Sequence, residues 1–497
     1  DAVREAATVG IKAAFEGVDM PGVQKYKNSI VSRMHKGLEG LVSSRGIDLI
    51  QGWGRLVAAD AVEVDGRRIT GRNVVLASGS YSKTIGQEIS GGVITSEEAL
   101  EMDHVPASAV ILGGGVIGVE FASAWASMGS QVTIIEGLPH LVPNEDEAIS
   151  KQLERAFRKR KITFRTNTMF ESVERHDGGV TVRTQDGKTH EAEVLLIAVG
   201  RGPATANLGY EEVGVAMDRG FVLADEYGHT NVPGVWAVGD IVPGVQLAHR
   251  GFAQGIVVAE KIAGLDPTPV DDVLVPKVTF CEPEIASVGL SEAKAAEIHG
   301  KENITSAEFN VAGNAKSQIL GTQGFVKLVS LKDGPILGFH AIGARMGEQV
   351  GEGQLMVSWE ADADDVAALV HGIEVEDVTA QQRSHVKAMS YGLAYGLSTF
   401  GLARQLGIDN AEAADLRNAY FARFGKVHDY LESVVEQARR DGYTETMFGR
   451  RRYLPDLTSD NRQRREMAER AALNAPIQGS AADIVKKAMI DVDSALR

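Results

Sequence analysis

A glycine-rich stretch, AVILGGGVIGVEFASAWASMGSQVTIIE (109–136), contains the residues with the clearest chemical potential. It places Gly113, Gly115 and Gly118 in a GxGxxG pattern, after an apolar run and at the start of a helical one. These glycines would permit a tight turn, close approach of the backbone to a diphosphate, and close packing of the helix on the sheet. The helix N-terminus adds free N–H groups and a dipole that favours an anion. The pattern predicts a dinucleotide-binding site.

An acidic residue, Glu136, ends the apolar strand that follows this helix. A carboxylate in that position accepts hydrogen bonds from ribose hydroxyls and repels a 2′-phosphate, which favours NAD over NADP. The strand, the helix and the terminal acid together make the signal specific. The alternative is a tight strand-to-helix turn that binds no ligand.

The elements that must hold this site alternate between strands and helices. We expect a helix at 23–45, short strands with an Asp-Gly turn at 53–69, a helix at 146–160 and short strands at 162–199. Residues 277–345 alternate with the strand period. This order predicts α/β domains with parallel sheets, followed by an α+β domain.

Two other glycine turns end apolar strands, Ala77-Ser78-Gly79-Ser80 and Gly239-Asp240. Each turn alone is ordinary punctuation between a strand and a helix. Their order around the dinucleotide unit suggests that Gly79 and Asp240 also serve a cofactor.

Composition narrows the class of protein. The chain has 497 residues, of which 44% are hydrophobic and 24% charged, as in ordinary globular proteins. No apolar run reaches the roughly 18 residues of a membrane helix, and the opening DAVREAATVG does not resemble a secretion leader. The chain has one cysteine, Cys281, so it has no intrachain disulfide. We expect a cytoplasmic protein without membrane partners, and we identify no metal site.

Charge is distributed unevenly along the chain. Residues 1–373 contain 33 basic and 49 acidic residues, whereas 374–497 contain 18 of each. The segment 439–470 has nine arginines, no lysine and six acids. It is either a salt-bridged helical surface or a surface that faces phosphates.

Residues 1–371 resemble dihydrolipoamide dehydrogenase, a flavin- and NAD-dependent disulfide oxidoreductase. The resemblance is nearly continuous and is carried by DMPGVQKYKNSIVSRMHKGL, NVVLASGS, GGGVIGVEFAS, AVGRGP, GVWAVGD, PEIASVGLSEA and GARMGEQVGEGQLMVSWEADADDVAALVH. It implies that NAD binds at Gly113, Gly115, Gly118 and Glu136, with Glu120 near the nicotinamide. It also implies FAD binding, with Asp240 on the ribityl chain and Gly79 near the flavin.

The chain also departs from this family. The family's flavin-binding GxGxxG and CxxxxC redox disulfide would lie before Asp1, and its catalytic His-Pro pair and Glu have no counterpart after His371, where the sequence reads Gly-Ile-Glu-Val-Glu. We interpret His371 as a non-catalytic upstream histidine of the family and Cys281 as a core residue. We therefore assign no catalytic residue, and we expect FAD binding to be weak or lost and lipoamide reduction to be absent.

Residues 374–497 resemble the fingers segment of a bacterial family-A DNA polymerase. Arg383, Lys387, Tyr391 and Tyr395 recur every four residues on one helical face, in a segment that continues as YGLAYGLSTFGLARQL. The resemblance implies that the two cations contact incoming phosphates and that the tyrosines lie at the nascent base pair.

A second polymerase signature is ERAALNAPIQGSAADIVKKAMI. In it, Arg470, Asn474 and Gln478 match residues that contact primer and template. The family's two metal-binding carboxylate motifs would lie on either side of this segment, outside it. Nucleotidyl transfer depends on metals held by such acids, so we expect no polymerisation.

The predicted fold class is α/β, with Rossmann-like dinucleotide-binding domains, an α+β interface domain and a mostly helical polymerase-like segment. The predicted domains are a truncated FAD-domain part, an NAD-binding domain, an FAD-domain return segment, a dimerisation domain and a fingers-like segment. Their ranges are 1–92, 93–215, 216–266, 267–373 and 374–497.

Three functions compete. The first is an NAD(H)-binding flavoprotein oxidoreductase of the dihydrolipoamide dehydrogenase type that lacks its catalytic groups. The second is a nucleic-acid-binding module, and the third is a chimera without function. The resemblance implies a homodimer through 267–370, and the arginine-rich part implies weak nucleic acid binding.

Overall fold

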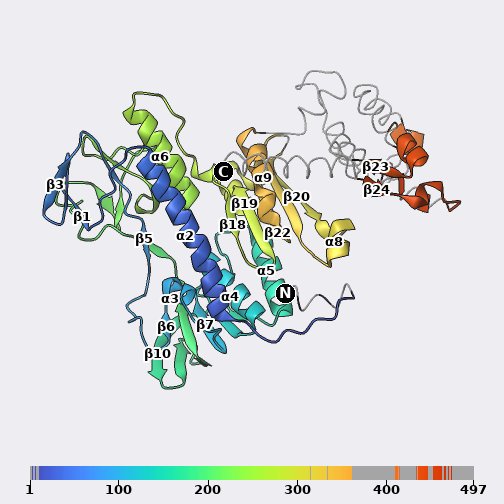
Figure 1. Cartoon of the computed structure of the whole chain (residues 1–497), viewed down its shortest axis with the longest axis horizontal. Coiled ribbons are helices and arrows are strands. Elements are labelled where there is room, and N and C mark those ends of the chain that lie inside the picture. The colour runs from blue at the N-terminus through green and yellow to red at the C-terminus, as the bar shows by residue number, and fades with distance from the viewer. Residues whose placement is uncertain are drawn as a thin grey trace. The chain divides into compact units, whose positions relative to one another are not determined.

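The computed structural model describes residues 10–360, apart from residues 314 and 333, together with residues 3 and 6. In the last part of the chain it describes residues 409–411, 413, 414, 433, 435–445, 451–461, 464, 465, 468, 469 and 472. The chain divides into two compact units, Asp1–Lys332 with Ile336–Glu360, and Asp333–Pro335 with Ala361–Arg497. Figure 1 shows the elements of each unit.

A five-stranded parallel sheet forms the centre of the first unit, in the order β6-β13-β7-β8-β9. Its strands are β6 (Val93–Ile94), β7 (Ser108–Leu112), β8 (Gln131–Ile135), β9 (Thr163–Arg165) and β13 (Val194–Ile197). The short capped helix α3 (Ser96–Leu100) follows β6. The expected strand-helix-strand unit at 109–136 is therefore present, because a parallel pair needs a crossover connection.

Alternate residues along these strands pack on opposite faces of the sheet, as the period of two requires. Ile111, Ile134 and Leu196 join the core formed with helices α4 (Val116–Met128) and α5 (Glu147–Lys159). Val110, Ile135 and Leu195 instead join Val180 and Val182. The latter belong to an antiparallel sheet of β10 (Phe170–His176), β11 (Gly179–Thr184) and β12 (Thr189–Ala192). The result is a helical layer and a strand layer on either side of the dinucleotide sheet.

A second part of this unit is built from smaller sheets. Helix α2 (Met20–Ser44) precedes the meander β1 (Gly54–Ala58), β2 (Ala61–Val64) and β3 (Arg67–Thr70), and the predicted Asp-Gly turn has positive φ at Asp65 and Gly66. Strand β4 (Val74–Leu76) pairs in parallel with β17 (Val235–Ala237), and β5 (Ser80–Ser82) pairs with β14 (Arg201–Pro203). The two-residue strands β15 (Met217–Asp218) and β16 (Phe221–Val222) pair with each other. The short helix η2 (Gly239–Ile241) follows β17, and helix α6 (Ala248–Ile262) lies further along the chain.

An antiparallel sheet organises residues 277–343, in the order β18-β19-β22-β21-β20. Its strands are β18 (Lys277–Thr279), β19 (Glu284–Gly289), β20 (Ile304–Asn310), β21 (Phe325–Leu331) and β22 (Ile336–Gly343), with α9 (Val350–Ser358) beside β19 and β22 (Figure 1). The strand period here was predicted, but the helices α7 (Glu292–His299) and α8 (Ala315–Leu320) interrupt it. Short helices η3 (Asp272–Leu274), η4 (Lys301–Asn303), η5 (Val311–Gly313) and η6 (Met346–Glu348) complete this part.

The second unit contains a hairpin, formed by β23 (Tyr443–Glu445) and β24 (Arg451–Tyr453). It is followed by η8 (Pro455–Thr458), and Ala438, Leu454, Leu457, Ala468 and Ala472 form a small core beside it. Arg451 bonds Glu445 at 2.7 Å, and Arg439 bonds Glu469 at 2.6 Å. For Arg439 and Arg451, these ion pairs favour a salt-bridged surface over a surface that faces phosphates.

Candidate functional site

The glycine loop lies between β7 and α4, at the carboxyl end of the parallel sheet. Gly113 has φ +108°, and a Cβ there would come within 2.4 Å of the carbonyl oxygen of Ala198. A Cβ at Gly118 would come within 1.9 Å of the carbonyl oxygen of Gly113, so the helix lies against its own loop. Both positions therefore require glycine for reasons of local packing.

Gly115 differs, because a Cβ there would meet no protein atom within 4 Å. It is the N-cap of α4 and provides no side-chain cap, and Val119 is the first residue whose amide bonds back into the loop. The amides of the first helical turn thus have no side-chain acceptor at the cap. An open backbone at a helix start is the arrangement that receives a diphosphate.

Glu136 follows β8 and reaches this loop. It is 8% exposed, and its Oε2 accepts a hydrogen bond from the Gly114 amide at 2.6 Å, while Oε1 accepts one from the Leu138 amide at 2.7 Å. The parallel pairing of β7 with β8 brings the carboxylate to the loop. Gly113, Gly115, Gly118 and Glu136 are therefore gathered at one edge of the sheet.

Glu120 lies further into α4 and is half-buried. Burial raises the pKa of its carboxyl above the ordinary value, and the Phe280 amide, which donates to Oε1 at 2.7 Å, acts against that rise. Cys281 is 7% exposed and belongs to the same core as α4 and α5, so its prediction as a core residue is confirmed. Burial raises the pKa of its thiol, which therefore stays protonated.

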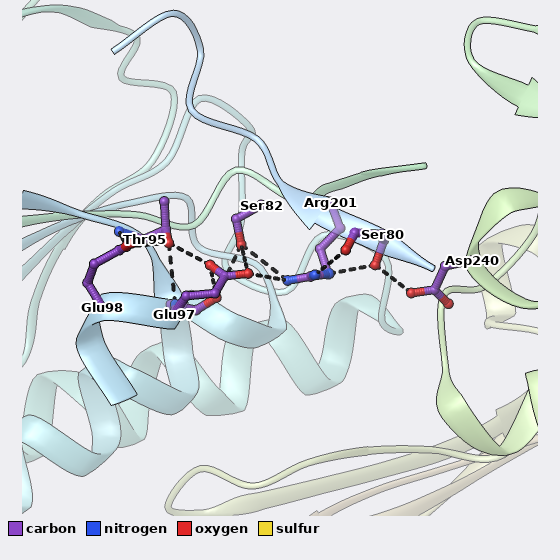
Figure 2. A network of polar contacts seen from close by, with 8 residues as sticks. Ser80, Ser82, Thr95, Glu97, Glu98, Arg201 and Asp240 are labelled. Atoms are coloured by element: carbon purple, nitrogen blue, oxygen red, sulfur yellow. Dashed lines mark hydrogen bonds and ion pairs between the residues drawn. The ribbon is translucent and has the colours of Figure 1, made fainter. Parts of the chain in front are cut away.

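The two flavin-associated predictions, Gly79 and Asp240, also lie near each other. Gly79 has φ +76° and open space at its Cβ position, and it immediately precedes β5. The Ser80 hydroxyl donates to Asp240 Oδ2 at 2.6 Å (Figure 2). One carboxylate oxygen of Asp240 is thus held by β5.

Sequence reasoning did not identify the network that extends from Ser80. Arg201 donates through Nε to Ser80 Oγ at 2.7 Å and through Nη1 to Ser82 Oγ at 3.1 Å (Figure 2). Its Nη1 also bonds Glu97 at 3.3 Å. Burial acts to raise the pKa of Glu97, but hydrogen bonds from Thr95, Ser82 and Arg201 outweigh it and lower the pKa to about 2. The pairing of β5 with β14 brings these side chains together, and the spacing of residues in the sequence does not reveal that pairing.

The polymerase-associated predictions lie outside the described residues. These are Arg383, Lys387, Tyr391, Tyr395, Arg470, Asn474 and Gln478, and His371 lies outside them too. Within the part that the structure describes, no group of three His, Cys, Asp or Glu side chains could hold a metal ion. Among the helices of that same part, none combines the length and apolar character needed to span a bilayer.

Family models match three stretches of the chain. Residues 3–255 match the pyridine nucleotide-disulphide oxidoreductase family, and residues 275–373 match its dimerisation domain. Residues 350–497 match DNA polymerase family A, which overlaps the dimerisation match over residues 350–373.

Curated relatives are similar over the same region. The chain is 36% identical to dihydrolipoyl dehydrogenase from Bacillus subtilis over 375 residues, which cover 73% of this chain and 79% of that protein. It is 35% identical to the enzyme of that name from Geobacillus stearothermophilus over 379 residues, covering 74% and 80%.

Solved structures share the fold. LpdA from Mycobacterium tuberculosis aligns with a TM-score of 0.67 at 24% identity, covering 73% of this chain and 82% of that one. The HOCl-induced flavoprotein disulfide reductase RclA from Escherichia coli aligns with a TM-score of 0.64 at 26% identity, covering 77% and 86%. The family uses FAD and NAD(P). The chain therefore belongs to the pyridine nucleotide-disulphide oxidoreductase family, as a flavoprotein oxidoreductase of the dihydrolipoyl dehydrogenase type joined to a DNA polymerase family A segment.

Proposed function

We propose that this chain binds NAD(H) at the Gly113–Gly118 loop and prefers it to NADP(H). The observation that carries the proposal is the position of Glu136, whose carboxylate lies against the loop through the Gly114 amide. A ribose next to that carboxylate gains hydrogen-bond acceptors, whereas a 2′-phosphate meets a negative charge. Bound NAD supplies hydride chemistry, and this chain's residues supply binding and orientation.

The residues around the loop fit such a ligand. Gly115 leaves open space at the start of α4, where backbone amides can receive a diphosphate. Glu120 lies further along α4, and we assign it to the nicotinamide side of the site. Titration of NADH into the purified chain, followed by NADH fluorescence, tests the site. Glu136→Ala should weaken binding, and an unchanged affinity in that variant would reject this location.

FAD binding by the 497-residue chain is proposed to be weak. Gly79 and Asp240 fit a flavin ribityl region, because Asp240 retains one carboxylate oxygen beyond its bond to Ser80. The sequence contains one GxGxxG loop, at Gly113–Gly118, and we propose that NAD binds there. No second loop of this type is present in the sequence to bind the diphosphate of FAD. The absorbance spectrum of the purified chain tests this: flavin well below one equivalent is expected, and one equivalent of bound FAD would contradict it.

Homodimerisation through residues 267–370 is part of the same proposal, supported by the match to a dimerisation domain. Light scattering tests it, and a 53 kDa species would contradict it.

A second candidate function, weak nucleic acid binding by residues 374–497, is supported by the match to DNA polymerase family A and by Arg452 and Tyr453, which are exposed on the β23–β24 hairpin.

A further inference from the structure

The segment between β18 and β19 is attached to helix α4 by backbone hydrogen bonds. The Phe280 amide donates to Glu120 Oε1 at 2.7 Å, and the Glu282 amide donates to Ser123 Oγ at 2.8 Å. Glu120 and Ser123 are three residues apart on α4, so they share a face of the helix. These bonds join residues that are 160 and 159 positions apart in the sequence.

Arg160, the C-cap of α5, fixes this attachment from the other side. Its Nη1 donates to Ser123 Oγ at 2.7 Å and to the Glu282 carbonyl oxygen at 2.8 Å. Its Nη2 donates to the Ser123 carbonyl oxygen at 3.0 Å and to Ser127 Oγ at 2.6 Å. One planar guanidinium thus joins α4, α5 and the Phe280–Glu282 segment, a geometry that the single ammonium of lysine cannot reproduce.

The Glu120 carboxylate depends on this segment for its orientation. It is half-buried, and burial raises its pKa while the Phe280 amide stabilises the charged form. The segment brings two titratable side chains, Cys281 and Glu282, and the Cys281 thiol is buried and protonated. Three charged groups act on that thiol, namely Glu120, Glu282 and Arg160. If the Phe280 contact were lost, the Glu120 carboxylate would remain half-buried but would lack its amide donor, so its pKa would rise further.

We propose that Arg160 is a positioning residue for the dinucleotide site: through Ser123 and Glu282 it holds the Phe280 amide against the Glu120 carboxylate. The segment lies within the match to the dimerisation domain, so that domain contributes backbone to the nicotinamide side of the site. The identity of the ligand rests on the proposed function, whereas the positioning is a property of the chain without ligand.

The first test measures the pKa of Glu120 directly, by carbon NMR of the full chain labelled at the glutamate carboxyl carbon. The Glu120 signal is assigned by its loss in Glu120→Gln. Arg160→Met should raise the pKa of Glu120 further, by about one, which corresponds to a tenfold change in proton affinity. Arg160→Lys should act in the same direction, because the fork is lost although the charge remains.

The matched control is Arg155→Met, on the same helix, whose side chain is exposed and bonds Gln152 at 3.4 Å. It should leave the pKa of Glu120 unchanged. If Arg160→Met fails to fold, Ser123→Ala removes the bridging hydroxyl with less loss of structure and should give a rise in the same direction. A folded Arg160→Met or Ser123→Ala chain with an unchanged Glu120 pKa would overturn the proposal.

The second test follows NADH affinity against pH in the same variants. Arg160→Met should move the pH midpoint of binding upward together with the pKa of Glu120, while Arg155→Met should not. If the native chain binds no NADH but its Glu120 pKa responds to Arg160→Met, the proposed function fails and the positioning stands. If NADH binds and neither the midpoint nor the pKa moves, the positioning is wrong and the proposed function stands.

Discussion

The Glu136 carboxylate accepts a hydrogen bond of 2.6 Å from the Gly114 amide. This bond joins the residue at the end of β8 to the loop at the end of β7. The loop that would contact a diphosphate and the acid that would contact a ribose therefore hold each other in place before any ligand arrives. Such preorganisation lowers the entropic cost of binding.

Replacing Gly115 by alanine should weaken NADH binding without unfolding the chain. Alanine tolerates φ −73°, and its Cβ meets no protein atom within 4 Å, but it would occupy the space next to the diphosphate. We expect a loss of about tenfold or more in affinity, or about 1.4 kcal/mol. NADH fluorescence titration measures it, with thermal melting as the check on folding.

The contrasting variant is Gly118→Ala, whose Cβ would lie 1.9 Å from a backbone oxygen. It should lower the melting temperature itself. Wild-type NADH affinity in Gly115→Ala would show that the diphosphate does not lie against this loop.

The 497-residue chain should not reduce lipoamide with NADH. The reaction class passes electrons through a disulfide, and the one cysteine, Cys281, is buried with a protonated thiol. An NADH oxidation assay with lipoamide and added FAD measures this. Turnover that persists in Cys281→Ser would mean that another group carries the electrons.

Replacing Lys327 by methionine should destabilise the first unit. Lys327 bonds Asp146 at 2.7 Å and Glu292 at 2.6 Å, and its side chain is 6% exposed while that of Asp146 is 2% exposed. Removing the cation leaves a buried carboxylate unpaired, which costs about 3–5 kcal/mol. Lys294→Met, which loses an exposed pair with Glu297, should change the free energy of unfolding by less than about 1 kcal/mol.

This pair also predicts a pH dependence. Burial acts to raise the pKa of Asp146, but the bonds from Lys327 and two backbone amides outweigh it, so the pKa lies below its ordinary value. A lowered carboxyl pKa stabilises the fold at higher pH, and that contribution is lost as pH falls below about 4. Urea unfolding from pH 3 to 7 should show less acid destabilisation in Lys327→Met than in the native chain. Equal acid sensitivity would contradict this account.

The parts of the candidate site that are local in the chain could be predicted from the sequence. Gly113, Gly118 and Glu136 could be identified because one strand-helix-strand unit sets their spacing, and the structure brings them together as that unit requires. The Asp-Gly turn at Asp65 and Gly66 was predicted for the same reason, since turn chemistry is encoded within a few residues.

Contacts between distant segments could not be predicted in this way. The Phe280 amide reaches Glu120, and Ser80 reaches Asp240, across 160 residues in each case. A backbone amide carries no sequence signal, and a serine is too common to indicate a partner. Helices α7 and α8 were not predicted, because each is short and lies between segments that alternate with the strand period.

The C-terminal part should bind DNA weakly and should not extend primers. The phosphate-facing residues expected from the sequence are Arg383, Lys387, Arg470 and Arg450–Arg452, but Arg451 is already paired with Glu445. We expect a dissociation constant no tighter than roughly 10⁻⁴–10⁻⁶ M that weakens with salt. Gel shifts at two salt concentrations and primer extension with magnesium measure both. Templated extension that Lys387→Ala abolishes would contradict the absence of polymerase activity.

The most direct test of the account is a calorimetric titration of the 497-residue chain with NADH and, separately, with NADPH. The position of Glu136 against the Gly113–Gly118 loop predicts that NADH binds with a stoichiometry near one and at least about tenfold more tightly than NADPH, or about 1.4 kcal/mol. Glu136→Gln, which keeps the side-chain shape and removes the charge, should narrow that difference. Tighter binding of NADPH than of NADH by the native chain would contradict the central claim.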